Sequence, residues 1–186
     1  MVNEMTKTEV SGALVAALVD SLPEAFRAAP LAMLAAHGLV PPFENRWFDT
    51  EKLWNVMNRF AEAYGPNTVF NIGKKIPAVL LLPSRVADCD SISDVPEAVD
   101  KIFHLYHRRD GRILYDPEND RFFEGLGRIR HRKTAPNAME LVANHPYPPD
   151  LTRGIIVRLA RKFDPLVNVL CEQKDGEAHF SVVWDE

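Results

Sequence analysis

The last third of the chain alternates short apolar runs with turn residues, a pattern that predicts two β-hairpins joined by one helix. The four predicted strands are residues 128–134, 138–143, 166–171 and 178–184. Asp175-Gly176, between the last two runs, is a strong signal for a hairpin turn. Residues 150–163 carry apolar side chains at three- and four-residue spacing, which predicts a helix between the hairpins. We therefore expect an antiparallel sheet in strand-strand-helix-strand-strand order with the helix on one face.

The preceding residues are expected to be mostly helical. The strongest of these helices follows Asp49, because apolar residues recur at three- and four-residue spacing after it. Thr8, Ser21 and Ser93 precede other apolar periodic segments, and each is predicted to be the N-cap of a helix. The fold class expected from the two parts is α+β, with an N-terminal helical part packed on the C-terminal sheet.

The chain has 186 residues, 46% of them hydrophobic, which is enough to bury the core of one domain. We expect a single domain, residues 1–186, with a helical subdomain at 1–107 and an α/β subdomain at 108–186. A net charge of −4 gives no overall attraction to nucleic acid or anionic lipid. The longest apolar run, 76–83, is shorter than the roughly 20 residues of a membrane-spanning helix. With no secretory signal expected either, a cytoplasmic location is predicted.

Sequence motifs typical of common enzyme sites are absent. The chain contains no phosphate-binding loop, zinc-protease helix, serine-hydrolase elbow or Cys-x-x-Cys pair. No dinucleotide-binding fingerprint is present. This favours a non-enzymatic protein with no catalytic residues and no cofactor.

Candidate metal ligands are weak. The acidic segment 116–120 resembles a calcium loop, but Arg121 stands where such a loop needs glycine, so a solvated turn is expected. His104 and His107 have a helical i, i+3 spacing that can converge on one ion. At about 100° per residue, however, His104 lies opposite the apolar stripe of its helix and is predicted to face solvent. We expect no metal site.

Three arginines, Arg128, Arg130 and Arg132, alternate along one predicted strand and should project from one face of the sheet. They could bind an anion or the acidic patch of a partner. Alternatively, they could form a solubilising face paired with nearby carboxylates. Base-stacking aromatic residues do not accompany them, so nucleic acid is not expected as a partner.

Placed in order, these elements resemble the domain shared by haem-nitric-oxide-binding (H-NOX) proteins and bacterial 4-vinyl-reductase-type domains, and more distantly by transport-particle subunits. The resemblance covers almost the whole chain in the order of elements. It is carried by Val10-Ser-Gly12, Gly38-Leu39, Trp54 with Tyr64-Gly65-Pro66, Ile72-Gly73 and the segment Tyr147-Pro-Pro-Asp-Leu-Thr-Arg-Gly-Ile-Ile156.

The resemblance implies a pocket between the N-terminal helices and the C-terminal α/β unit, used for small hydrophobic or tetrapyrrole-like ligands and often for sensing. In the haem branch, an inward histidine binds iron and a Tyr-x-Ser-x-Arg motif holds the propionates. The equivalent of the first position falls near Asp100, and His104 is the nearest histidine. The motif region reads Ala143-Asn-His-Pro-Tyr147. The cysteine cluster of some vinyl-reductase-type domains has no counterpart here.

The leading hypothesis is a non-enzymatic sensor domain that binds a small hydrophobic or acidic ligand and acts through a homodimer or a partner protein. Aromatic side chains supply ligand-burying area and a few polar groups fix orientation. On this basis the candidate ligand-binding residues are Trp54, Phe70, Tyr106, His145, Tyr147 and Arg153. One alternative is a domain that binds haem or another tetrapyrrole, with His104 as the candidate ligand, or an enzyme acting on such a ring. The other alternative is an interaction scaffold that uses the arginine face.

Overall fold

A computed structural model describes residues 7–80 and 82–185. Its N-terminal part contains β1 (Thr8–Ser11), α1 (Gly12–Asp20), the short 3-10 helix η1 (Glu24–Phe26), α2 (Ala28–Ala36), β2 (Trp47–Asp49), α3 (Thr50–Tyr64), α4 (Pro66–Val79), α5 (Ser84–Ala87), the 3-10 helix η2 (Ile92–Asp94) and α6 (Val95–Leu105). The C-terminal part contains β3 (His107–Arg109), β4 (Arg112–Ile113), β5 (Tyr115–Asp116), β6 (Arg121–Phe122), β7 (Ile129–Ala135), β8 (Ala138–Ala143), α7 (Pro149–Ala160), β9 (Asn168–Lys174) and β10 (Glu177–Val183). Within these residues, none of the helices combines the length and the apolar character that crossing a membrane requires.

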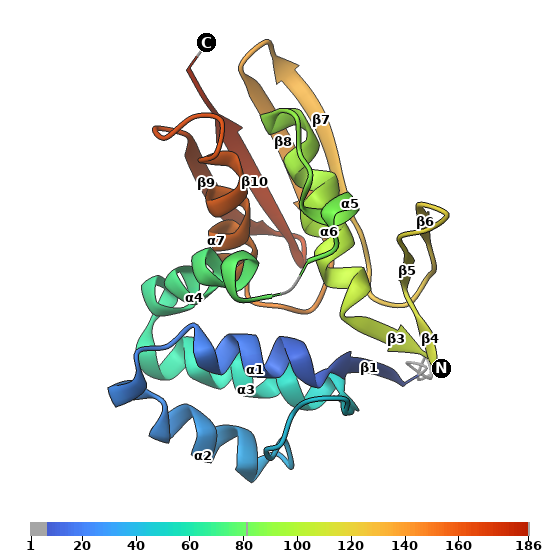
Figure 1. Cartoon of the computed structure of the whole chain (residues 1–186). Coiled ribbons are helices and arrows are strands. Elements are labelled where there is room, and N and C mark those ends of the chain that lie inside the picture. The colour runs from blue at the N-terminus through green and yellow to red at the C-terminus, as the bar shows by residue number, and fades with distance from the viewer. Residues whose placement is uncertain (1–6, 81, 186) are drawn as a thin grey trace.

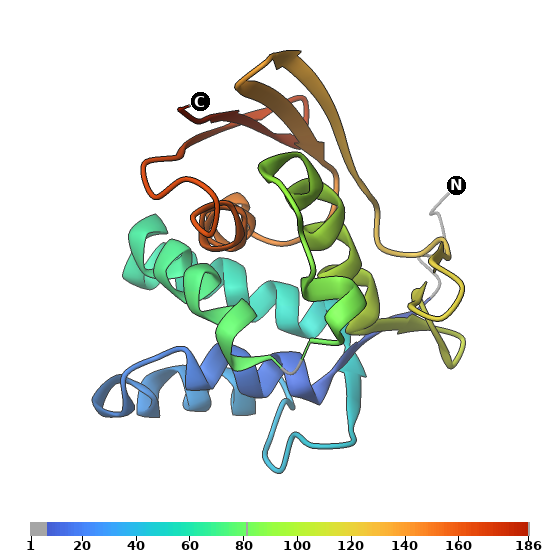
Figure 2. The same ribbon diagram turned by 45° about the horizontal axis from the view of Figure 1, so that its top comes forward.

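The main sheet is antiparallel, with strand order β7-β8-β10-β9. Met139, Leu141, Phe180 and Val182 are buried on one face, in alternation with less buried neighbours. Helices α6 and α7 lie side by side beneath this face, and the N-terminal helices form further layers below them (Figures 1 and 2). The predicted α+β class and the strand-strand-helix-strand-strand order are confirmed.

A second sheet, with strand order β2-β1-β3-β4, was not predicted. Strand β1 pairs with β2 through Val10 and Phe48, and with β3 through Val10 and His107. Thus β3, which follows residue 106, pairs with the N-terminal part of the chain, and β4 extends this sheet by pairing with β3. The division into subdomains 1–107 and 108–186 stays a prediction.

The start of α3 is as expected, whereas the start of α1 is not. Asp49 caps α3, since its Oδ1 accepts a hydrogen bond from the main-chain N–H of Glu51 at 3.0 Å. Thr8 is not an N-cap, because it begins strand β1. The cap of α1 is Ser11, whose Oγ accepts from the N–H of Ala13 at 3.2 Å. The sequence pattern of a cap therefore appeared in the right region but three residues too early.

Two other predicted caps are wrong. Ser21 lies at the C-terminal end of α1, where its Oγ donates to the carbonyl of Ala17 at 2.7 Å. The hydroxyl is therefore used by the preceding helix, not by η1. Before α6, Ser91 rather than Ser93 forms the capping box, together with Asp94.

Helices α4 and α7 cross with their main chains in contact, and this crossing joins the N-terminal helices to the C-terminal unit (Figure 1). A Cβ at Gly154 would lie 2.2 Å from the carbonyl oxygen of Phe70. A Cβ at Gly73 would lie 2.2 Å from the carbonyl oxygen of Leu151. Only glycine permits so close an approach at these two positions.

Candidate ligand-binding site

The face of α6 that was expected to be solvated is buried. His104 is only 1% exposed. The ring of Phe122, from the short β5-β6 hairpin, lies edge-on to it with the ring centroids 5.1 Å apart. The helical phase placed His104 opposite the apolar stripe correctly. The prediction of solvent exposure is nevertheless wrong, because the hairpin covers this second face.

One nitrogen of His104 is bound and the other has no partner. Nδ1 lies 2.8 Å from the carbonyl oxygen of Asp100, one turn earlier in the helix. Because a carbonyl only accepts, Nδ1 carries the proton. Nε2 is buried and forms no hydrogen bond with any residue that the structure describes. Burial lowers the pKa of His104, an effect that the carboxylate and the carbonyl of Asp100 partly oppose, so the ring is neutral near pH 7. A neutral imidazole with a free lone pair is suited to bind a metal.

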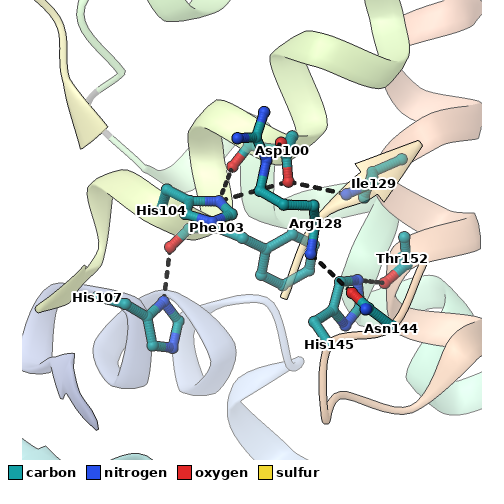
Figure 3. A network of polar contacts seen from close by, with 9 residues as sticks. All are labelled: Asp100, Phe103, His104, His107, Arg128, Ile129, Asn144, His145 and Thr152. Atoms are coloured by element: carbon teal, nitrogen blue, oxygen red, sulfur yellow. Dashed lines mark hydrogen bonds and ion pairs between the residues drawn. The ribbon is translucent and has the colours of Figure 1, made fainter. Parts of the chain in front are cut away.

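The Asp100 carboxylate links α6 to the beginning of β7 (Figure 3). It is 2% exposed. Its Oδ2 accepts from Nε of Arg128 at 2.6 Å, and its Oδ1 accepts from the N–H of Ile129 at 3.1 Å. The guanidinium of Arg128 also lies over the ring of Phe122, 3.8 Å from its centroid. Asp100 therefore holds in place both the first residue of an edge strand and the cation that packs on Phe122.

The three arginines do not share one open face. Arg128 precedes β7 and is directed to Asp100. Arg130 pairs with Glu177 at 2.8 Å, and Arg132 pairs with Glu140 at 2.6 Å. Each guanidinium thus has a carboxylate partner within the chain, and an anion or partner site on this face stays a prediction.

A second histidine, His107, is wholly buried between α6 and the C-terminal unit. Its Nδ1 donates to the carbonyl of Phe103 at 2.6 Å, and its Nε2 therefore accepts from the hydroxyl of Tyr147 at 2.6 Å. Burial lowers the pKa of His107 to about 3 and raises the pKa of Tyr147. The pair is a neutral, fully hydrogen-bonded contact in the core.

Aromatic rings fill the space between α6 and α7. The ring of His145 lies on that of Phe103 with centroids 4.4 Å apart, and Tyr147 stacks on Phe103 at 5.4 Å. Nε2 of His145 is 3.2 Å from the hydroxyl of Thr152, whereas Nδ1 is buried without a partner among the described residues (Figure 3). Burial, and to a lesser extent His104, lower the pKa of His145 to about 4. Sequence reasoning did not select Phe103, which lies on α6, and it considered His107, which begins β3, only as a metal ligand beside His104.

The structure divides the predicted ligand-binding residues among different places. Trp54 and His145 line an open cleft of about 820 Å³ between the N-terminal part and the loops at 125–127 and 144–146. Phe70 lies at the α4-α7 crossing, where Arg153 stacks on its ring at 4.6 Å and also pairs with Asp150 at 2.9 Å.

The remaining two candidates lie apart from this cleft. Tyr147 is in the core, and Tyr106 is half-buried at the end of α6. Their roles in ligand binding, like those of the other four, stay predictions. Across residues 7–80 and 82–185, no three side chains from His, Cys, Asp and Glu converge where they could hold a metal ion.

The combination of a helical N-terminal part and a sheet that covers α6 and α7 defines a known fold. The chain matches an H-NOX protein from S. oneidensis, solved in its Fe(II)NO ligation state, with a TM-score of 0.62 and 14% identity over 95% of this chain and 99% of that one. It matches an oxygen-binding H-NOX domain related to soluble guanylate cyclases with a TM-score of 0.57 and 15% identity over 95% of each chain. A third H-NOX structure, solved to probe the function of haem distortion, matches with a TM-score of 0.60 and 14% identity over 95% of each chain.

This chain has the H-NOX fold, and the resemblance inferred from the order of its elements is confirmed. No family model and no curated protein match the sequence. The expectation of no cofactor is overturned by these comparisons, because the matching structures are studied for their haem, its distortion and its gas ligands.

Proposed function

We propose that this chain is a sensor-type domain that binds a tetrapyrrole, with haem as the first candidate. The observation that carries the proposal is the free Nε2 of His104, buried on α6 of an H-NOX fold. The histidine that binds haem iron usually donates its second ring N–H to a carbonyl or carboxylate, which fixes the tautomer. Nδ1 of His104 has this arrangement with the carbonyl of Asp100.

Bound haem would supply an iron able to take up a diatomic gas such as nitric oxide or oxygen, as the structures of similar fold do. The chain's own contribution is to keep His104 neutral, oriented and shielded from water. Burial keeps the ring unprotonated, and the Asp100 carbonyl fixes its tautomer. The Arg128 guanidinium beside it is a cation within reach of an acidic substituent.

Access to Nε2 of His104 requires movement of the β5-β6 hairpin, because the Phe122 ring lies against the imidazole. Each strand of this hairpin has two residues, and the hairpin stands away from the main sheet (Figure 1). It is therefore the element beside His104 that can be displaced with the least loss of main-chain hydrogen bonds.

We further propose that the domain acts in the cytoplasm, without catalysis of its own, through a homodimer or a partner protein. Strand β9 supports this proposal, since it is an edge strand of the main sheet. Leu166 and Leu170, before and within β9, are 78% and 61% exposed. An edge strand with exposed apolar side chains is a typical surface for protein association.

The test is to titrate the purified chain with haemin and record the visible absorption. We expect a saturable Soret band at one haem per chain, and loss of that band in His104→Ala. The control is His131→Ala, because His131 is exposed on β7, and this variant should retain the band. Absence of a band in the unaltered protein, or an undiminished band in His104→Ala, would contradict the proposal. Circular dichroism shows whether each variant remains folded.

A further inference from the structure

A groove of about 990 Å³ lies away from the histidines of α6. One wall comes from the end of α1, η1 and the start of α2, and the other comes from the end of α3 and from α4. Arg158, on α7, and Arg161, which directly follows α7, also line the groove. The groove belongs mainly to the N-terminal helical layer, whereas the cleft that contains His145 lies on another side of α3.

The groove exposes apolar side chains that a folded protein usually covers. Phe26, on η1, is 69% exposed, and Tyr64, at the end of α3, is 43% exposed. Phe60 and Ile72, in the floor, also line a small void of about 20 Å³ between α1, α2, α3 and α4. Every residue around that void is apolar, so it is not a water site. The groove therefore has an apolar floor, with only a small void beneath it.

The charged residues that line the groove are all cationic: Lys74, Lys75, Arg158 and Arg161. Nζ of Lys75 donates to the carbonyl of Ser21 at 2.9 Å and so bridges the two walls. Arg158, on α7, and Arg161, the C-cap residue after it, are exposed and have no ion pair or hydrogen bond with the residues that the structure describes. Two unpaired guanidiniums that line an apolar groove complement one anionic group on an apolar ligand.

We propose that this groove binds an amphiphilic carboxylate, that is, a fatty acid whose alkyl chain lies along the floor and whose carboxylate is held by Arg158 and Arg161. Guanidinium groups bind carboxylates through paired hydrogen bonds, which distinguishes the acid from an uncharged alcohol of equal length. Burial of the tail against Phe26 and Tyr64 covers the exposed aromatic area. All the charged lining residues are cationic, which favours an anionic amphiphile over an uncharged apolar ligand.

The test is calorimetric titration of the protein, prepared without haem, with decanoate, dodecanoate and dodecanol. We expect one dodecanoate per chain, with affinity rising by up to roughly fourfold per methylene and at least tenfold weaker binding of dodecanol. The double variant Arg158→Gln/Arg161→Gln should weaken dodecanoate binding by at least tenfold. The matched control, Arg130→Gln/Arg132→Gln, removes two arginines from the opposite part of the molecule and should leave binding unchanged.

A second variant tests the tail separately from the head group. Ala29 is an exposed lining residue of α2, so Ala29→Trp should fill the groove without disturbing the core and should abolish binding. Equal binding of dodecanol, equal loss in the control variant, or retained binding in Ala29→Trp would overturn the proposal. The proposal would also be overturned if the chain failed to bind dodecanoate and sedimented as a dimer, and if Ala29→Trp dissociated that dimer. The groove would then be a contact between two copies of the chain. None of these outcomes depends on whether haem binds near His104.

Discussion

The substitution Gly154→Ala places one methyl group where the main chains of α7 and α4 meet. The new Cβ would lie 2.2 Å from the carbonyl oxygen of Phe70 and 2.9 Å from Cα of Gly73. Both are main-chain atoms, which cannot rotate out of the way as a side chain can. Since carbon and oxygen atoms in contact lie about 3.4 Å apart, the two helices must separate locally by about 1 Å.

The expected cost follows from two opposing effects. Overpacking a close contact costs about 1–3 kcal/mol, and the upper end applies here because the obstructing atoms are main chain. Alanine is a better helix former than glycine by about 1 kcal/mol, which offsets part of that cost. We therefore expect Gly154→Ala to lower the free energy of unfolding by about 2 kcal/mol. With a urea m-value of about 2 kcal/mol/M, the midpoint falls by about 1 M.

Urea unfolding followed by far-ultraviolet circular dichroism measures this difference. A suitable control is Asn55→Ala, at an exposed position of α3, which gains helix propensity without a contact and should be neutral or slightly stabilising. If Gly154→Ala were as stable as the unaltered protein, the helices would be able to separate freely. The inference that this crossing firmly joins the two parts of the molecule would then be wrong.

Two further predictions concern the buried polar groups. Burial lowers the pKa of His107 to about 3 and that of His145 to about 4, so below pH 6.5 the unfolded chain takes up protons before the folded one. The contribution of these two histidines to the free energy of unfolding is complete above pH 6.5 and is lost as the pH falls towards 4 and 3. Urea unfolding at pH 7 and at pH 5 should therefore show a loss of about 2 kcal/mol per histidine between the two pH values. The variant His107→Gln should reduce the total loss by about that amount. The substitution Asp100→Ala should lower the free energy of unfolding by about 3 kcal/mol, because it leaves the N–H of Ile129 unpaired and Arg128 without its carboxylate. Urea unfolding measures this difference, and a loss below about 1 kcal/mol would contradict the prediction.

The C-terminal sheet could be predicted because its signals are local. In the turn between β9 and β10, Asp175 has φ 52° and Gly176 has φ 81°, the positive values for which an Asp-Gly pair is selected. Asp49 could likewise be recognised as a cap from its own neighbourhood. The second sheet could not be foreseen, because β1 pairs with residues 47–49 and 107–109, and nothing in its four residues specifies those distant partners.

The candidate site could be predicted only in part, for a similar reason. Helical periodicity located the face on which His104 lies, but its environment depends on Phe122, which comes 18 positions later in a hairpin with two-residue strands. Periodicity cannot tell an exposed polar face from one that a distant loop covers. The division of Trp54 and Phe70 between different sides of the molecule also arises from tertiary packing, since both were chosen for their side-chain type.

The first N–H of β7 donates its hydrogen bond to Asp100, so the hydrogen bonding at one edge of the main sheet depends on the position of α6. Strand β7 has a neighbour on one side, β8, and its other edge faces away from the sheet. A shift of α6 along its axis would withdraw the carboxylate from Ile129 and leave a main-chain donor unsatisfied at the beginning of that edge. A free donor on an edge strand favours pairing with a strand from another chain. Through the Asp100 carboxylate, a change at His104 that shifts α6 would alter how readily β7 pairs with a strand from another chain.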